Sequence, residues 1–392
     1  MRHPRVLVAT VLTLLSASGL AACEQPPPPA IFPSDSQTVA DSSQQTGRRV
    51  NLPLPDCTAR PSDCNDVRLI NELDGFDLAP RVSVDFTGPL IDIGKVNTNT
   101  VYLQRVGDSR HIGLQPLVLD RSTNTLFGQP EEILRERSRY EIVVTSAVNG
   151  QAGTSAFGTM SASVGLRRMV GQLDSDAAYT AAGITAGQRG LDFVIDGQRR
   201  VYPAANVVRP RRFDDLRVGS GDALVEQPVF DSGDANLGAA GTYAFGSFLA
   251  PQWIDGDRKI PNVATGAAAG PTVRGRARVG FTMILPQATP TRPKPAGGWP
   301  VAIFGPGVTR SKYDLFLASD ENLKKGIATV AIDPVGHAYG PASRSGVDLL
   351  IPLSEVKFTG FGRAVDVEGD GEYSARDGLS TARQPARDAS IA

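Results

Sequence analysis

The stretch "VAIFGPGVTRSKYD", residues 301–314, decides the fold expected for the C-terminal half of this chain. Four apolar residues lead directly into Gly305-Pro306-Gly307, and a polar sequence with helical character follows. A second apolar run, "IATVAID", comes after Gly326, which we expect to cap that helix. The order strand, turn, helix, strand predicts a βαβ unit, and hence a parallel sheet covered on both faces.

The sequence before this stretch indicates several further parts. Short β-type runs such as "RVSVDF", "TVYLQRV" and "RYEIVVTSAV", separated by turn sequences, predict a small sandwich over residues 48–159. Their order resembles the Ig-like domains that precede catalytic domains in bacterial surface proteins. Apolar residues at helical spacing predict a helical connector over 160–205. Strand patterns return in "TYAFGSFL" and "ARVGFTMILP", so a second domain is expected over 206–392.

The N-terminus indicates export. A basic start and an uncharged apolar run precede Cys23, as in a secretory signal peptide. "LAAC" at 20–23 resembles the bacterial lipobox, in which the cysteine is lipidated after cleavage. The resemblance implies that residues 1–23 are a lipoprotein signal peptide and that the protein contacts a membrane through acylated Cys23. The expected location is the outer membrane, periplasmic or surface-facing. The alternative is an ordinary signal peptide with an incidental cysteine.

Residues 24–47 are rich in Pro, Ser and Gln, so we expect a disordered tether between the lipid and the folded body. Cys57 and Cys64 follow it in "DCTARPSDC". A cysteine pair in an oxidising compartment predicts a disulfide. Because this disulfide would close a short loop, we expect it to restrain the chain only locally. Metal binding by this pair is disfavoured because none of the three histidines is near it in sequence.

A second resemblance rests on residues 297–340, "GGWPVAIFGPG…AIDPVGHAYG". This segment resembles the opening of the α/β-hydrolase core in bacterial extracellular lipase and esterase lipoproteins. The resemblance implies an incomplete α/β-hydrolase-like parallel-sheet domain, an ester or lipid substrate, and oxyanion-hole N–H groups at Gly307 and Val308. The alternative is an ordinary strand-to-helix turn of a Rossmann-like domain. A dinucleotide site is disfavoured because the third glycine of G-x-G-x-x-G is missing.

The sequence departs from that family in two ways. Pro306 occupies the usual histidine position, and the 392 residues contain no G-x-S-x-G. Without a Ser–acid–His triad no catalytic residue can be assigned, so enzymatic activity is left open. We expect a chain truncated before the nucleophile elbow, or else a degenerate protein. Ser311 and Ser319 are interpreted as solvated serines at a helix start, in preference to nucleophiles.

An acidic, glycine-containing loop near the C-terminus has the spacing of a calcium site. Gly371 occupies the position of the sharp turn in "DVEGDGEYSARD", residues 366–377. The expected calcium ligands are Asp366, Glu368, Asp370, Glu372 (through its carbonyl), Ser374 and Asp377. The alternative is a solvated surface turn without a metal.

Composition limits the functions that remain. A formal net charge of −1 gives no nucleic-acid footprint. The first hypothesis is a lipid-anchored protein related to carboxylic-ester hydrolases and inactive as this chain. The alternative is a non-catalytic envelope or surface-binding lipoprotein with Ig-like and calcium-binding elements. A solute-binding lipoprotein would need two similar α/β lobes, and only one βαβ unit is predicted.

Overall fold

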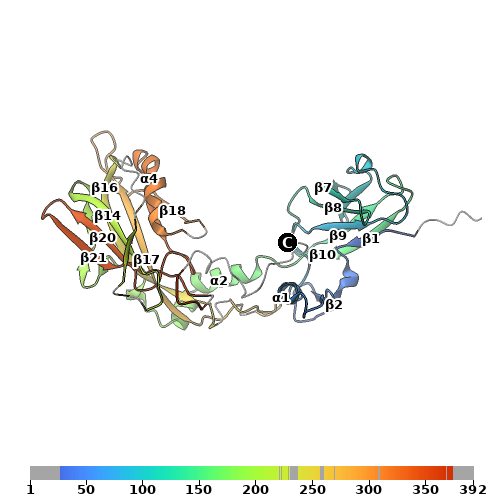
Figure 1. Cartoon of the computed structure of the whole chain (residues 1–392), viewed down its shortest axis with the longest axis horizontal. Coiled ribbons are helices and arrows are strands. Elements are labelled where there is room, and N and C mark those ends of the chain that lie inside the picture. Colours follow the sequence, from blue (N-terminus) through green and yellow to red (C-terminus); the bar gives the residue numbers. More distant parts are fainter. Residues whose placement is uncertain are drawn as a thin grey trace, which may run out of the picture. The chain divides into compact units, whose positions relative to one another are not determined.

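The computed structural model describes residues 27–219, 221, 223–227, 229, 237–256, 260–268, 270–307, 310–367 and 369–373. The chain divides into two compact units (Figure 1). Unit 1 comprises Met1–Ala40, Thr46–Asn51 and Leu73–Ala162; unit 2 comprises Asp41–Gln45, Leu52–Glu72 and Ser163–Ala392. The protein is thus multidomain and mostly β-sheet, with few helices.

Unit 1 contains two four-stranded antiparallel sheets, ordered β1-β4-β8-β7 and β10-β9-β5-β6, and the ribbon β2-β3. Its strands are β1 (Ala30–Phe32), β2 (Thr38–Ala40), β3 (Arg48–Val50), β4 (Val82–Asp85), β5 (Val101–Arg105), β6 (His111–Ile112), β7 (Leu114–Asp120), β8 (Thr125–Pro130), β9 (Arg139–Val144) and β10 (Gly153–Gly158). Its short 3-10 helices are η1 (Asp35–Gln37) and η2 (Ile93–Lys95).

Alternation of apolar residues explains these strands. In β9, Tyr140, Ile142 and Val144 are buried while the residues between them are not. Since successive side chains of a strand point to opposite faces, one face of the sheet is covered by the core. Phe157 of β10 is fully buried beside Tyr140, with the two rings 6.0 Å apart. The β character predicted from these runs is confirmed.

The expected tether over 24–47 is corrected by the structure over the part of it that is described. β1 pairs antiparallel with β4, and β2 pairs with β3. Asp35 forms an ion pair with Arg139 at 2.7 Å. The Pro- and Ser-rich composition led to the prediction of disorder. A three-residue edge strand can nevertheless be ordered with few apolar side chains, because the neighbouring strand supplies its hydrogen-bond partners.

Unit 2 contains a five-stranded sheet ordered β13-β16-β17-β19-β18, a four-stranded sheet ordered β15-β14-β20-β21, and the pair β11-β12. Its strands are β11 (Val194–Ile195), β12 (Gln198–Arg199), β13 (Val201–Pro203), β14 (Val207–Asp214), β15 (Val225–Gln227), β16 (Ala240–Gln252), β17 (Gly275–Pro286), β18 (Val301–Phe304), β19 (Ala328–Ile332), β20 (Arg344–Leu349) and β21 (Ser354–Thr359). Its helices are α1 (Pro61–Ile70), α2 (Val164–Asp174), α3 (Ala177–Ala181), α4 (Leu315–Lys324) and the 3-10 turns η3 (Ala186–Gln188), η4 (Ala204–Asn206) and η5 (Lys312–Asp314).

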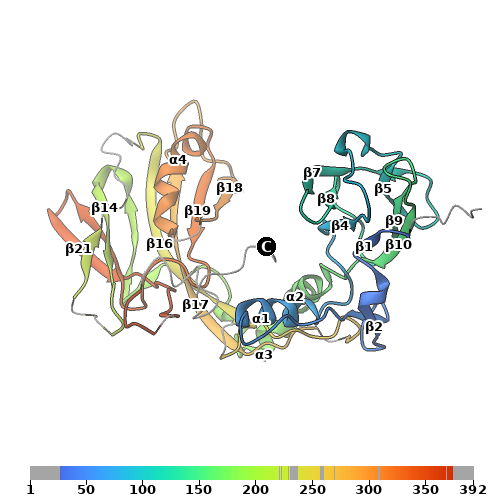
Figure 2. The ribbon, with the colours of Figure 1, turned by 45° about the vertical axis from the view of Figure 1, so that its right-hand side comes forward.

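The strand-helix-strand unit predicted from residues 301–333 is present. β18 and β19 are parallel neighbours, and α4 connects them and lies against their sheet (Figure 2). Gly326 follows α4 with a φ of 77°, the left-handed conformation expected of a capping glycine. Leu315, Phe316 and Leu323 of α4 are buried in the core of unit 2.

The prediction of a wider parallel sheet around this unit is wrong. Among the named strands of the described residues, β18 and β19 form the one parallel pair. The long strands β16 and β17 form an antiparallel hairpin, and β17 also pairs antiparallel with β19. The sheet is therefore mixed and mostly antiparallel. No described helix is both long enough and apolar enough to cross a bilayer.

Candidate functional site

The glycine turn lies where the sequence placed it, at the end of β18. Since β18 and β19 are parallel, Gly305-Pro306-Gly307 and Asp333 share one edge of the sheet. Neither glycine has a positive φ, and a Cβ at Gly305 would meet no atom within 4 Å. The glycines are therefore not required here by backbone strain or close approach. Val308 lies outside the described residues.

A buried ion pair occupies this edge. Lys312, at the start of η5, and Asp333, directly after β19, are 3% and 0% exposed. Both carboxylate oxygens of Asp333 accept hydrogen bonds from Lys312, one from its backbone N–H at 2.7 Å and one from Nζ at 2.5 Å. The same Nζ donates to the carbonyl oxygen of Gly360 at 2.7 Å. One lysine thus joins the βαβ crossover to the segment that follows β21.

The charge on Lys312 is stabilised by this arrangement. Burial disfavours an ammonium ion, but the charge and hydrogen bond of Asp333, together with Tyr313 and Asp214, outweigh that effect and raise the pKa of Lys312. Arg363 adds a hydrogen bond from its guanidinium to the backbone carbonyl of Asp333 at 3.0 Å. Replacing one member of such a pair with an uncharged residue would leave an uncompensated charge in the protein interior.

Hydroxyl groups beside the pair are also engaged within the protein. Tyr313 and Ser345 of β20 are hydrogen-bonded through their hydroxyls, and both are buried. Ser311 is 2% exposed, and its Oγ accepts from the backbone N–H of Tyr313 and from Arg212, each at 3.4 Å. Ser319 is fully buried and donates to the carbonyl oxygen of Leu315. Ser311 and Ser319 are therefore buried and hydrogen-bonded within the fold, so the prediction that they are solvated is wrong.

A second charged pair lies at the end of β14. Arg212 Nε donates to Asp214 Oδ2 at 3.0 Å, while Asp214 Oδ1 has no hydrogen-bond partner among the described residues. Burial raises the pKa of Asp214 to about 7, and Arg212 and Lys312 only partly oppose it. The Arg212 guanidinium also lies over the ring of Tyr339 at 5.1 Å. Asp214 is thus an acid that changes charge near neutral pH.

Taken together, the polar groups at this edge bind one another. Perturbed pKa values do gather at functional sites, but ion-pair networks inside a fold perturb them equally. Here the side chains of Lys312, Asp333 and Asp214 are almost inaccessible, and the cations Lys312 and Arg212 lie within ion-pair distance of Asp333 and Asp214. The network joins β14, β19, β20 and η5, so its evident role is to hold the two sheets of unit 2 together.

Sequence reasoning did not find this network. In the sequence Asp333 is the last residue of the apolar run "IATVAID", and Lys312 was assigned no role. A usable signal was present, because an acid directly after a buried strand and a lysine directly before a helix lie at the same end of a βαβ unit. "RRFDDLR", residues 211–217, gave no comparable indication of Asp214.

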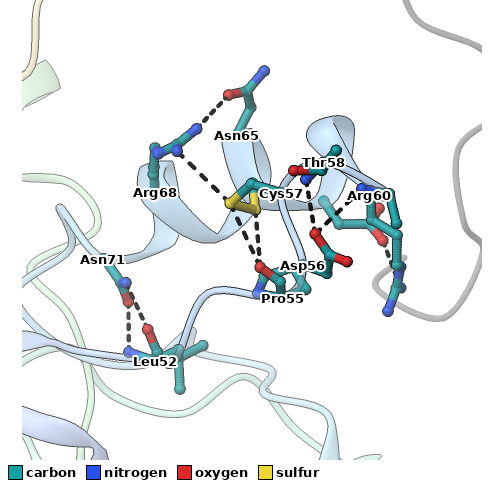
Figure 3. The surroundings of a disulfide bond; sticks show 12 residues. Leu52, Pro55, Asp56, Cys57, Thr58, Arg60, Asn65, Arg68 and Asn71 are labelled. Atoms are coloured by element: carbon teal, nitrogen blue, oxygen red, sulfur yellow. Dashed lines mark hydrogen bonds and ion pairs between the residues drawn. A yellow bond between two sulfur atoms is a disulfide. The ribbon is translucent and has the colours of Figure 1, made fainter.

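The disulfide lies in unit 2. Cys57 and Cys64 are bonded, the pairing expected from sequence, with their Cα atoms 5.4 Å apart. It closes the turn that enters α1, as Figure 3 shows. Asp56 Oδ1 accepts from the backbone N–H of Thr58 at 2.9 Å within that turn. At the other end of α1, Asn71 exchanges two hydrogen bonds with the backbone of Leu52, at 2.7 and 2.9 Å. The helix is thereby tied down at both ends.

Part of the expected calcium loop is visible. Asp366 uses its carboxylate to accept hydrogen bonds from the backbone N–H groups of Gly369, Asp370 and Gly371. Glu372 faces Arg217, with Oε1 and Nε 3.8 Å apart. Within the described part of the chain no three acidic, histidine or cysteine side chains converge as a metal site. Glu368, Ser374 and Asp377 lie outside that part, as does Cys23.

Unit 1 has a small surface cavity of about 150 Å³. Its lining includes the ion pairs Arg110–Glu132 and Arg105–Asp108, together with Arg135 and the buried Tyr140. The Arg110 guanidinium, hydrogen-bonded to Glu132, lowers the pKa of that carboxyl group. The charges of the cavity are therefore largely balanced by one another.

Comparison with known proteins gives few leads. No protein-family model and no curated protein matches this chain. Among solved structures, similarity is found to the N-terminal part of the bacterial S-layer protein SbsC, with a TM-score of 0.18, 9% identity, and coverage of 58% of this chain and 45% of that one. Domains 1-6 of surface layer protein SbsC give a TM-score of 0.18 at 9% identity, with coverage of 57% and 26%. The chain thus spans less than half of the structures it matches.

The expected membership of the lipase and esterase lipoproteins is overturned. The sheet that ends at the glycine turn is mostly antiparallel over its described strands, in place of the parallel sheet that the resemblance implied, and no hydrolase family model matches the chain. At these TM-scores the neighbours assign no fold. The resemblance failed because the turn after β18 and the parallel pair β18–β19 are local features that a mixed sheet also contains.

Proposed function

We propose that this chain is a non-catalytic envelope lipoprotein, held at a membrane by acylated Cys23 and acting by binding. The observation that carries the non-catalytic part is the closed network around Lys312 and Asp333. Lys312, Asp333, Arg212 and Asp214 at this sheet edge are each buried or paired within unit 2. A catalytic group must reach its substrate, and these groups cannot do so without breaking the fold.

An extracytoplasmic location is supported by separate features. The basic start, apolar run and "LAAC" precede a folded body that contains a disulfide, Cys57–Cys64. Disulfides persist in oxidising compartments and are rare in the cytosol. The two antiparallel sheets of unit 1 support an Ig-like sandwich, which is a common binding architecture. The loop at 366–377 remains a proposed calcium-binding element.

The test is the fate of Cys23 in a bacterial host. Cells expressing the full chain are labelled with radioactive palmitate and then fractionated. We expect label on the wild-type protein and its recovery with the membranes. Cys23→Ser is expected to abolish both the label and the recovery with membranes. Cys57→Ser, which replaces a disulfide cysteine, is expected to keep the label. Label on Cys23→Ser, or an unlabelled wild-type protein in the soluble fraction, would overturn the proposal.

A further inference from the structure

The β20–β21 hairpin ends in an unusual turn. Figure 1 shows strands β20 and β21 of this hairpin. Leu350-Ile351-Pro352-Leu353 connects them, so the whole turn is apolar. Leu350, Ile351 and Leu353 are 54%, 74% and 85% exposed. Single exposed aliphatic residues are common on proteins, but three at one hairpin tip form a contiguous apolar protrusion. Hairpin turns normally carry Gly, Asn, Asp or other polar residues.

The tip is held in place and not merely exposed. Asn206, at the end of η4, accepts a hydrogen bond from the backbone N–H of Ile351 and donates one to its carbonyl oxygen, each at 2.8 Å. The backbone N–H of Leu350 donates to the carbonyl oxygen of Asn206 at 2.9 Å. Three hydrogen bonds therefore fix the turn with its aliphatic side chains in water, although collapse onto unit 2 would bury them.

The first charged residues behind the tip are neutralised. Asp348 and Glu355 are opposite each other in the β20–β21 register. Asp348 pairs with Arg209 at 2.8 Å and with Arg211 at 3.2 Å, and Glu355 pairs with Arg211 at 2.6 Å. Burial disfavours the charge of Asp348, but its pairing with Arg209 and Arg211 outweighs this and lowers the pKa of Asp348. The tip thus emerges from a collar with little net charge.

From this geometry we infer that the Leu350–Leu353 turn inserts into the interfacial region of a lipid bilayer, as a second membrane contact beside acylated Cys23. The inference rests on the proposed envelope location. Lipid chains on Cys23 would keep the chain at a bilayer surface, where even a weak second contact gains from the high effective concentration of lipid. A convex tip of four residues is far smaller than the 20 to 30 residues a side typical of a stable protein interface, and it fits between lipid chains. The neutral collar predicts attraction to lipid that does not depend on headgroup charge.

The experiment uses the mature chain, residues 23–392, carrying Cys23→Ser so that acylation cannot contribute. Co-sedimentation with phosphatidylcholine vesicles is measured for this protein and for Leu353→Ser in the same background. We expect binding to the neutral vesicles, equal at low and high salt, and a loss of about tenfold in partitioning with Leu353→Ser, because most of one leucine side chain leaves the lipid. The matched control is Ile133→Ser in unit 1, which removes an aliphatic side chain that is 76% exposed.

The outcomes separate the alternatives. An unchanged partition for Ile133→Ser together with the loss for Leu353→Ser supports the inference. Equal partitioning of both variants, or no vesicle binding at all, overturns it. If Leu353→Ser instead abolishes self-association in analytical ultracentrifugation, the tip contacts a second copy of this chain and the bilayer is excluded. Because the protein is not acylated, failure of the palmitate experiment leaves this test unaffected.

Discussion

Replacing Lys312 with methionine tests the buried network most directly. Methionine fills a similar volume but cannot pair with Asp333, whose carboxylate is then buried with the backbone N–H of residue 312 as its remaining partner. Removing one member of a buried ion pair destabilises proteins by about 3–5 kcal/mol. The loss includes the hydrogen bond to the carbonyl oxygen of Gly360.

The effect is large enough to measure by urea unfolding. Both tryptophans of the chain, Trp253 and Trp299, belong to unit 2, so their fluorescence reports on the unit that contains the network. With a urea dependence of about 3 kcal/mol per molar for a unit of this size, Lys312→Met lowers the midpoint by about 1 to 2 M. The protein must remain folded without denaturant for this comparison, which circular dichroism establishes.

Two further variants make the result interpretable. Lys324→Met removes an exposed lysine of the same crossover, paired with Asp320 and Glu321, and is expected to leave the midpoint unchanged. Lys312→Met combined with Asp333→Leu removes both charges, leaving the backbone N–H of residue 312 and the carbonyl oxygen of Gly360 without these partners, and should restore at least half of the loss. The reasoning is refuted if Lys312→Met is no more destabilising than Lys324→Met, or if the double variant is the least stable.

Three other expectations follow. Because the pKa of Asp214 rises from 3.8 to about 7 on folding, the native state binds the proton more tightly than the unfolded state. Unit 2 should therefore lose stability, on the order of 4 kcal/mol, as pH rises from about 4 to 7. Asp214→Asn should flatten this pH dependence in urea titrations at several pH values, and an unchanged slope would contradict the assignment. Replacing both Cys57 and Cys64 with serine should lower stability by about 2 kcal/mol, as thermal unfolding would show, whereas an unchanged midpoint would mean that α1 needs no covalent restraint. If the loop at 366–377 binds calcium, calorimetry should detect heat that Asp366→Asn removes; absence of heat at millimolar calcium excludes the site.

The sequence predicted the local elements well where their signals are local. The apolar runs at 301–304 and 328–332, and the capping glycine Gly326, are sufficient to specify β18, α4 and β19. It did not predict the neighbours of those strands. Nothing in the sequence of β19 shows that β17 pairs with it antiparallel, because that pairing depends on the long β16–β17 hairpin closing over many residues. The error about the parallel sheet followed from extending a local pattern to a global topology.

The candidate site was harder to predict because its contacts are distant in sequence. Lys312 and Asp333 are 21 positions apart, and Arg212 is 99 positions from Ser311. Titratable residues are also common, so composition could not separate these from their exposed neighbours. The apolar turn at 350–353 was readable in principle, since four consecutive apolar residues are unusual in a hairpin turn. It was overlooked because an apolar run is first interpreted as a strand.

The edge of parallel strands illustrates why a binding site and a stabilising network can have the same sequence appearance. Both use a carboxylate after one strand and backbone N–H groups before a helix, since that edge leaves those groups without partners. Accessibility distinguishes them. Asp333 is fully buried, and both of its carboxylate oxygens accept hydrogen bonds from Lys312, so they are engaged within the fold. Exposed groups held by hydrogen bonds, such as the Leu350–Leu353 turn clamped by Asn206, are therefore the better candidates for contact with a partner.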